Sequence, residues 1–189
     1  DEDPETIEDI SKVGYGGVLC IETGGPTPGL GCAGRGIIAT FSLLEDLELF
    51  ETHQPDVVLY DVLGDVVCGG FSMPMRRGYA DKIFVITSGE NMAIHAAANI
   101  AMAVENFKDR GYAQLGGLIL NRRNVKNEDA KVEELAEDIH SKVIGTLSRS
   151  ELVTDAEEQK KTVIEAYPDS EMAEEYRILA GKIRTLCGI

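Results

Sequence analysis

The segment KIFVITSGENMAIHAAANIAMAVENFKDRGYAQLGGLILN, residues 82–121, predicts the fold class of the chain. Its two ends, 82–87 and 116–121, are apolar runs rich in Ile, Val and Leu, which are typical of buried strands. The Ala-rich residues between them, 90–107, predict a helix. A strand, a helix and a second strand in this order indicate a βαβ unit, whose two strands run parallel in one sheet.

The alternation of apolar runs and helical patterns extends along the rest of the chain. Apolar runs at 18–22, 56–61 and 142–147 predict three more buried strands. The acidic segment 127–140 predicts a helix with a solvated face and not a partner site. The sequence therefore predicts an α/β fold, a single domain over 1–189 with a mostly parallel sheet and helices on both faces. The predicted helices are 35–48, 90–107, 127–140 and 169–185.

The composition limits the class of partner. A chain of 189 residues with 43% hydrophobic content can bury a sizeable core. Its formal net charge of −15 argues against nucleic acid and anionic membrane surfaces as partners. No apolar run approaches the roughly 20 residues that a membrane-spanning helix needs. Few and widely spaced cysteines in a large α/β chain favour a reducing, cytoplasmic compartment, in which thiols are available for metal.

Two of the four cysteines lie in glycine-rich loops. Cys32 lies in TGGPTPGLGCAGRGI (23–37) just before a predicted helix, and Cys68 lies in DVLGDVVCGG (61–70). A thiolate near a helix N-terminus is stabilised by the helix dipole and by free amides. Flanking glycines let backbone amides approach the sulfurs of an iron–sulfur cluster. The alternative is that the glycines serve a tight turn around a buried cysteine.

An iron–sulfur cluster takes four thiolates, so two cysteines per chain predict a cluster shared by two subunits of a symmetric dimer. Structural zinc sites pair cysteines two to four residues apart, unlike Cys32 and Cys68. Cys20, inside a predicted strand, and Cys187, near the end of the chain, are interpreted as structural.

The residues before Cys68 predict a nucleotide switch. Asp61 ends an apolar run, where nucleotide-hydrolysing α/β proteins place an acid on the Mg²⁺ side. The Gly64 amide would approach a terminal phosphate, and Asp65 would position or sense the water. A solvated turn after a strand is the alternative. Because Asp65 is close to Cys68 in the chain, movement of the acids would move the thiol.

Five segments together resemble the nitrogenase iron protein family, including nitrogenase-like reductase components. The resemblance runs in order from about residue 12 to 183, and its two cysteine motifs are specific. The segments are GYGGVLCIETGGPTPGLGCAGRGI, YDVLGDVVCGGFSMPMR, ITSGENMAIHAAANI, GGLILNRRN and KKTVIEAYPDSEMAEEYRILA.

This resemblance implies a P-loop NTPase-type fold and a homodimer bridged by one 4Fe–4S cluster. It implies MgATP hydrolysis coupled to electron delivery to a catalytic metalloprotein, with ferredoxin or flavodoxin as electron donor. The residues that it implies are Cys32 and Cys68 as cluster ligands, Asp61, Gly64 and Asp65 as the catalytic switch, Asn121, Arg149 and Glu157 at the nucleotide, and Arg35 as the partner-docking residue.

The chain departs from the family pattern in two respects. The 189 residues contain no G-x-x-x-x-G-K-[ST] motif, whose amides and lysine cradle phosphates. We therefore expect the C-terminal two-thirds of a longer protein, and no ATP hydrolysis by these residues alone. In addition, Ser150 stands where the family usually has aspartate, and Asn91 stands where it often has methionine.

Three functions follow from these patterns. The first is an ATP-dependent reductase component of the nitrogenase type. The second is a nitrogenase-like paralogue that donates electrons to a tetrapyrrole or thioether reductase. The third is a cluster-free P-loop switch ATPase acting as a scaffold or metal-delivery protein. The cysteines of CAGRGI and CGGF favour the first two over the third.

Overall fold

A computed structural model describes most of the chain, which forms two compact units, Asp1–Pro74 and Met75–Ile189. For residues 33–35 it describes the backbone alone. A single domain over 1–189 stays a prediction. The described residues are 4–22, 33–62, 64, 73–76 and 78–189.

The first unit contains a hairpin and two longer helical segments. Its strands pair antiparallel, with Val13 opposite Leu19, and a 3₁₀ turn at Tyr15–Gly17 joins them. Its buried residues Ile7, Leu44 and Leu49 form one small cluster. The described elements of this unit are α1 (Ile7–Ile10), β1 (Ser11–Val13), β2 (Leu19–Ile21), α2 (Ala33–Asp46) and α3 (Leu49–His53).

The second unit contains the predicted βαβ unit and its continuation. None of the helices in the described part of the chain has the length and apolar character needed to cross a membrane. The elements are β3 (Lys82–Thr87), α4 (Asn91–Phe107), a 3₁₀ turn (Lys108–Arg110), β4 (Gln114–Asn121), α5 (Glu128–Asp138), β5 (Val143–Leu147), α6 (Glu151–Glu158), α7 (Val163–Ala166) and α8 (Glu171–Cys187).

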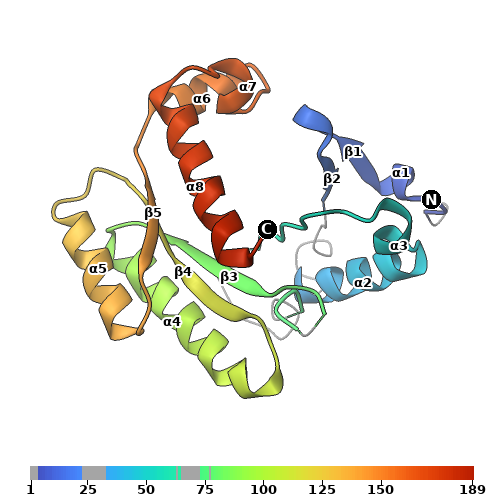
Figure 1. Ribbon diagram of the computed structural model, residues 1–189, viewed down its shortest axis with the longest axis horizontal. Coiled ribbons are helices and arrows are strands. Elements are labelled where there is room, and N and C mark those ends of the chain that lie inside the picture. The colour runs from blue at the N-terminus through green and yellow to red at the C-terminus, as the bar shows by residue number, and fades with distance from the viewer. Residues whose placement is uncertain (1–3, 23–32, 63, 65–72, 77) are drawn as a thin grey trace. The chain divides into compact units, whose positions relative to one another are not determined.

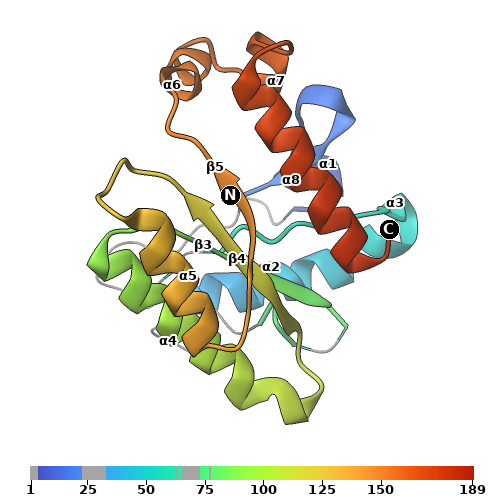
Figure 2. The same ribbon diagram turned by 60° about the vertical axis from the view of Figure 1, so that its left-hand side comes forward.

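The three strands of the second unit form one parallel sheet in the order β3-β4-β5. Helices α4 and α5 cover one face of this sheet, and α8 packs against β5 on the other face (Figures 1 and 2). The predicted α/β class, with helices on both faces of a parallel sheet, is confirmed.

The main core lies between this sheet and the helices α4 and α5. Leu118 and Leu120 of β4 and Val132 of α5 are at most 1% exposed. Burial of each such aliphatic side chain is worth about 1.5–3 kcal/mol. β4 is the central strand of the sheet, with a neighbouring strand on each edge. A central strand that is covered on both faces has no polar side, which explains why its run LGGLIL is fully apolar.

A second core joins β5 to the last three helices. Leu147 of β5 contacts a cluster that contains Ala156, Val163, Met172 and Ala173. The short helices α6 and α7 were not predicted. Each begins at a hydroxyl side chain that caps it, because the oxygens of Ser150 and Thr162 accept from the amides of Leu152 and Glu165.

Two of the predicted buried strands are wrong. Residues 56–61 form no strand, and Leu59 is 82% exposed, because no described strand pairs with this segment and a strand requires a hydrogen-bonded neighbour. Residues 18–22 contain the strand β2, but it pairs with β1 in an antiparallel hairpin and is not fully buried. A local apolar run does not specify which strand will be its neighbour.

Two glycines provide a matched test of packing in the second unit. A methyl group on Gly89 would overlap Cβ of Glu128 and lie 2.6 Å from its Cα, whereas one on Gly181 in α8 would meet nothing. We expect Gly89→Ala to lower the free energy of unfolding by about 1–3 kcal/mol. Gly181→Ala should raise it by about 0.5–1 kcal/mol, because alanine favours the helix. Urea unfolding measures both, and equal effects of the two substitutions would contradict the close approach at Gly89.

Candidate functional site

The carboxyl edge of the parallel sheet brings two predicted nucleotide contacts to the same side of the second unit. Asn121 is the last residue of β4 and lies opposite Leu147, the last residue of β5. Arg149 is the second residue after β5, and both Asn121 and Arg149 are exposed. Ligands of open α/β sheets bind at this edge, where the strands end.

The backbone of the β4–α5 connection is tied to its neighbours by three hydrogen bonds. The Arg122 amide donates to the Leu147 carbonyl oxygen (2.9 Å), and the Arg123 amide donates to Oε2 of Glu128 (3.0 Å). The Arg149 guanidinium donates to the Arg123 carbonyl oxygen (3.5 Å). The connections after β4 and β5 therefore contact each other.

The β5–α6 connection is held by a carboxylate from α8. Both the amide and the hydroxyl of Ser148 donate to Glu175, each at 2.7 Å and each to a different carboxylate oxygen. Burial raises the pKa of the neighbouring Tyr176 hydroxyl, and the negative charge of Glu175 raises it further. Glu175 is thus an internal acceptor that fixes the first residue after β5.

Glu128 is a second internal acceptor that the sequence analysis missed. The acidic pattern of 127–140 predicts a solvated face for this residue, but Glu128 is only 6% exposed and packs against Gly89. The signal was present in the helical spacing, because Glu128 precedes the buried Val132 and Ala136 by one and two turns of α5. For Glu128 the prediction of a solvated side chain is therefore wrong.

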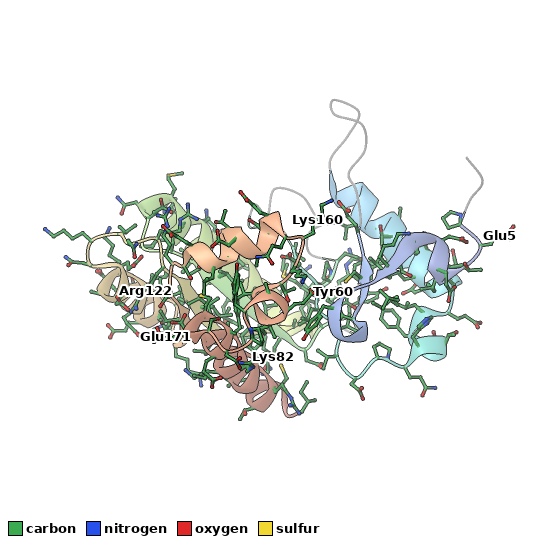
Figure 3. All side chains as sticks on the ribbon, turned by 90° about the horizontal axis from the view of Figure 1, so that it is seen from above. Glu5, Tyr60, Lys82, Arg122, Lys160 and Glu171 are labelled. Carbon is green, nitrogen blue, oxygen red and sulfur yellow. The ribbon has the colours of Figure 1, made fainter. Side chains whose placement is uncertain are left out.

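Arg122 is the first residue of the β4–α5 connection (Figure 3). Its guanidinium forms an ion pair with Asp129 of α5. The hydrogen bond that Arg122 donates to Asp129 raises the pKa of Arg122, and the negative charges of Asp129, Glu128 and Glu175 make smaller contributions in the same direction. This exposed ion pair links the β4–α5 connection to the first turn of α5.

A groove of about 470 Å³ lies at the carboxyl end of β3. The Lys131 ammonium lies 3.2 Å from the Gly89 carbonyl oxygen and 3.4 Å from Oδ1 of Asn91. Asn91 is one of the two departures from the family pattern. Its side-chain oxygen accepts a hydrogen bond from Lys131 of α5, which the thioether of a methionine would accept only weakly. The groove is lined by Glu90, Asn91, Met92, Ala93, Val125 and Lys131.

Comparison with known proteins relates this arrangement to a family. Residues 2–186 match the model of the "4Fe-4S iron sulfur cluster binding proteins, NifH/frxC family". The chain belongs to this family. It is 50% identical over 186 residues to the nitrogenase iron protein of Methanospirillum hungatei JF-1, covering 97% of this chain and 65% of the relative. It is 45% identical over 185 residues to the nitrogenase iron protein of Methanococcus voltae, covering 97% of this chain and 66% of the relative.

The chain therefore spans about two-thirds of the length of these NifH/frxC-family relatives. Among solved structures, it resembles the cell division ATPase MinD of Pyrococcus furiosus with a TM-score of 0.58 and 17% identity. The similarity covers 81% of this chain and 59% of that one. At this identity it shows the fold alone, and it confirms the predicted P-loop NTPase-type fold class.

The remaining predicted site residues of this NifH/frxC-family chain are distributed over both units. Asp61 and Gly64 belong to the first unit and are exposed, whereas Glu157 lies exposed on α6 of the second unit. Arg35 lies in the first turn of α2, and its side chain is outside the described residues. The predictions for Cys32, Asp65 and Cys68 also fall outside the described residues.

No group of three or more potential metal-ligating side chains occurs among the residues that the structure describes. Cys20 and Cys187 are free and exposed, so neither packs in a core as a structural cysteine would. Their exposure makes them suitable controls for the cysteines of the two glycine-rich motifs.

The other departure of this chain from the family pattern is Ser150, which stands where the family usually has aspartate. Its hydroxyl caps α6, because Oγ accepts from the Leu152 amide at 3.2 Å. Serine and aspartate are equally good residues at this position of a helix. The exchange of one for the other therefore preserves the start of α6.

We expect Ser150→Ala to lower the free energy of unfolding by about 1 kcal/mol, because the Leu152 amide loses its acceptor. Ser150→Asp should leave it unchanged within about 0.5 kcal/mol, since the carboxylate also caps the helix. Thr154→Ala, an exposed change inside α6, is the control for helix propensity. If thermal unfolding showed Ser150→Asp to be as destabilising as Ser150→Ala, aspartate would not replace serine as the cap of α6.

Proposed function

We propose that this chain is the cluster-bearing part of an ATP-dependent electron-transfer protein, a reductase component that delivers electrons to a catalytic metalloprotein. The observation that carries the proposal is the presence of Cys32 and Cys68 in glycine-rich motifs of a chain whose family is described by 4Fe–4S cluster binding. The names of the relatives, nitrogenase iron proteins, support a nitrogenase-type partner.

The donor set of the chain fits such a cluster. Two thiolates from each subunit of a symmetric dimer give the four that a 4Fe–4S cluster requires. Helix α2 begins at Ala33, the residue after Cys32 in the sequence, and its 14 residues direct a positive dipole end toward that position. A cluster bound there would supply one-electron transfer, while these residues would hold it and lower the thiol pKa.

The nucleotide is assigned to two sets of residues. Asn121, Arg149 and Glu157 would recognise the base, because the first two lie at the carboxyl edge of the sheet. Asp61, Gly64 and Asp65 would act at the magnesium and terminal phosphate, and would transmit hydrolysis to Cys68. We assign no residue of this chain to a phosphate-binding loop, since the 189 residues contain no G-x-x-x-x-G-K-[ST] motif.

The partners follow from this assignment. A homodimer would hold the cluster, ferredoxin or flavodoxin would reduce it, and Arg35 beside Cys32 would dock the acceptor protein. A cytoplasmic, reducing compartment would keep the four thiols free. The similarity to MinD is one of fold, so it does not favour a cluster-free switch ATPase as a second function.

We expect Cys32→Ser and Cys68→Ser each to abolish the cluster, because either change leaves the dimer with two thiolates. Reconstitution of the full-length gene product with iron and sulfide, followed by iron analysis and visible absorption, measures this loss. Cys20→Ser and Cys187→Ser are the matched controls, since both thiols are exposed and free in the structure. A full complement of iron in Cys68→Ser would contradict the proposed ligands.

The switch acids provide a second test. ATP should make the cluster of the full-length gene product more accessible to an iron chelator, because the loop from Asp61 to Cys68 responds to the terminal phosphate. Asp65→Asn should remove this acceleration and leave the cluster intact. Asp56→Asn, an exposed acid in the same unit, should retain it. Chelation rates that do not respond to ATP in the unmodified protein would contradict the coupling.

A further inference from the structure

The connection that follows Asn121 and the connection that contains Arg149 are each anchored to a carboxylate from a helix. Glu128 of α5 accepts from the Arg123 amide, and Glu175 of α8 accepts twice from Ser148. In the part of the chain that the structure describes, no buried side-chain polar atom is left without a partner. These carboxylates are therefore used internally, and neither is available as a ligand in this arrangement.

The Glu175 contact is the stronger of the two anchors. Both of its oxygens receive a hydrogen bond at 2.7 Å, and hydrogen bonds to an ionised acceptor are roughly twice as strong as neutral ones. The helix that carries it is itself immobilised, because Met172 and Ala173 are buried and Leu179 packs over Gly145 of β5. Glu175 thus holds Ser148 against a rigid element.

The anchor acts directly on the neighbouring residues. Arg149 follows Ser148 and its guanidinium reaches the Arg123 carbonyl oxygen, while Ser150 caps α6, the helix that bears Glu157. A ligand loses affinity when its binding loops must be ordered at the moment of binding. A connection already fixed by Glu175 would avoid that cost for Arg149 and Glu157.

We propose that Glu175 is a positioning residue for the base of the bound nucleotide, acting through Ser148. Glu128 likewise holds the β4–α5 connection, which follows Asn121, by accepting a hydrogen bond from the Arg123 amide. The inference rests on the proposed assignment of Asn121, Arg149 and Glu157 to the nucleotide. It adds that recognition of the base depends on a carboxylate of α8 that does not touch the nucleotide.

The test compares a ligand that has a base with one that lacks it. Dissociation constants of MgATP and of magnesium tripolyphosphate are measured by calorimetry on the full-length gene product. Glu175→Ala should weaken MgATP binding roughly tenfold, the effect of losing one charge-assisted hydrogen-bonded anchor, and leave tripolyphosphate binding unchanged. A merely structural role would weaken both ligands together or neither.

Three further variants separate positioning from stability. Ser148→Ala removes one of the two hydrogen bonds and should lower the ATP preference by a smaller factor, and Ser148→Thr, which keeps the hydroxyl, should restore it. Glu174→Ala is the matched control, because this neighbouring carboxylate pairs with Arg177 on the exposed side of α8. If Glu175→Ala fails to fold, the Ser148 pair decides the question.

Two results would overturn the inference. If Glu175→Ala or Ser148→Ala keeps the preference of the unmodified protein for MgATP over tripolyphosphate, the anchor does not position the base-binding residues. If the unmodified protein shows no such preference, the nucleotide assignment itself fails and the inference fails with it. The first result leaves the proposed function intact, so the two failures are distinguishable.

Discussion

The parallel hydrogen bonding of β4 to β3 and β5 is the constraint on which the second unit depends. It sets Thr87 opposite Leu120 and Asn121 opposite Leu147, so that all three strands end at one edge of the sheet. Parallel strands need a crossover between them, and the helices α4 and α5 supply it on one face. Residues far apart in the sequence, such as Gly89, Asn121 and Arg149, are brought to that edge as a consequence.

Close packing behind this edge explains why Glu128 is buried there. Gly89 lets the first residue of α5 approach the β3–α4 connection, and Glu128 loses its contact with water as a result. A buried carboxylate is tolerated only when it is hydrogen-bonded, and the Arg123 amide meets that need. On the other side of the sheet, Glu175 and Ser148 satisfy each other in the same manner. The edge is thus built from backbone groups held by side-chain acceptors.

The departures from the family pattern have local physical explanations. Ser150 keeps the cap of α6, and Asn91 gains a hydrogen bond from Lys131 that a thioether would accept only weakly. Membership of the NifH/frxC family and the fold of an α/β ATPase are therefore compatible with both changes.

The sequence by itself determined β3, β4, β5 and the four long helices α2, α4, α5 and α8. It could do so because the spacing of apolar residues along a segment indicates whether one face of a helix or both faces of a strand are buried. It also identified Cys32 and Cys68, since glycine-framed thiols form a local pattern.

Tertiary structure alone decided the absence of a strand at 56–61, the antiparallel pairing of β2, and the roles of Glu128 and Glu175. Each depends on a partner from elsewhere in the chain. An apolar run becomes a strand only when a neighbouring strand accepts its hydrogen bonds, and an acid becomes an internal anchor only when packing brings a donor to it and excludes water.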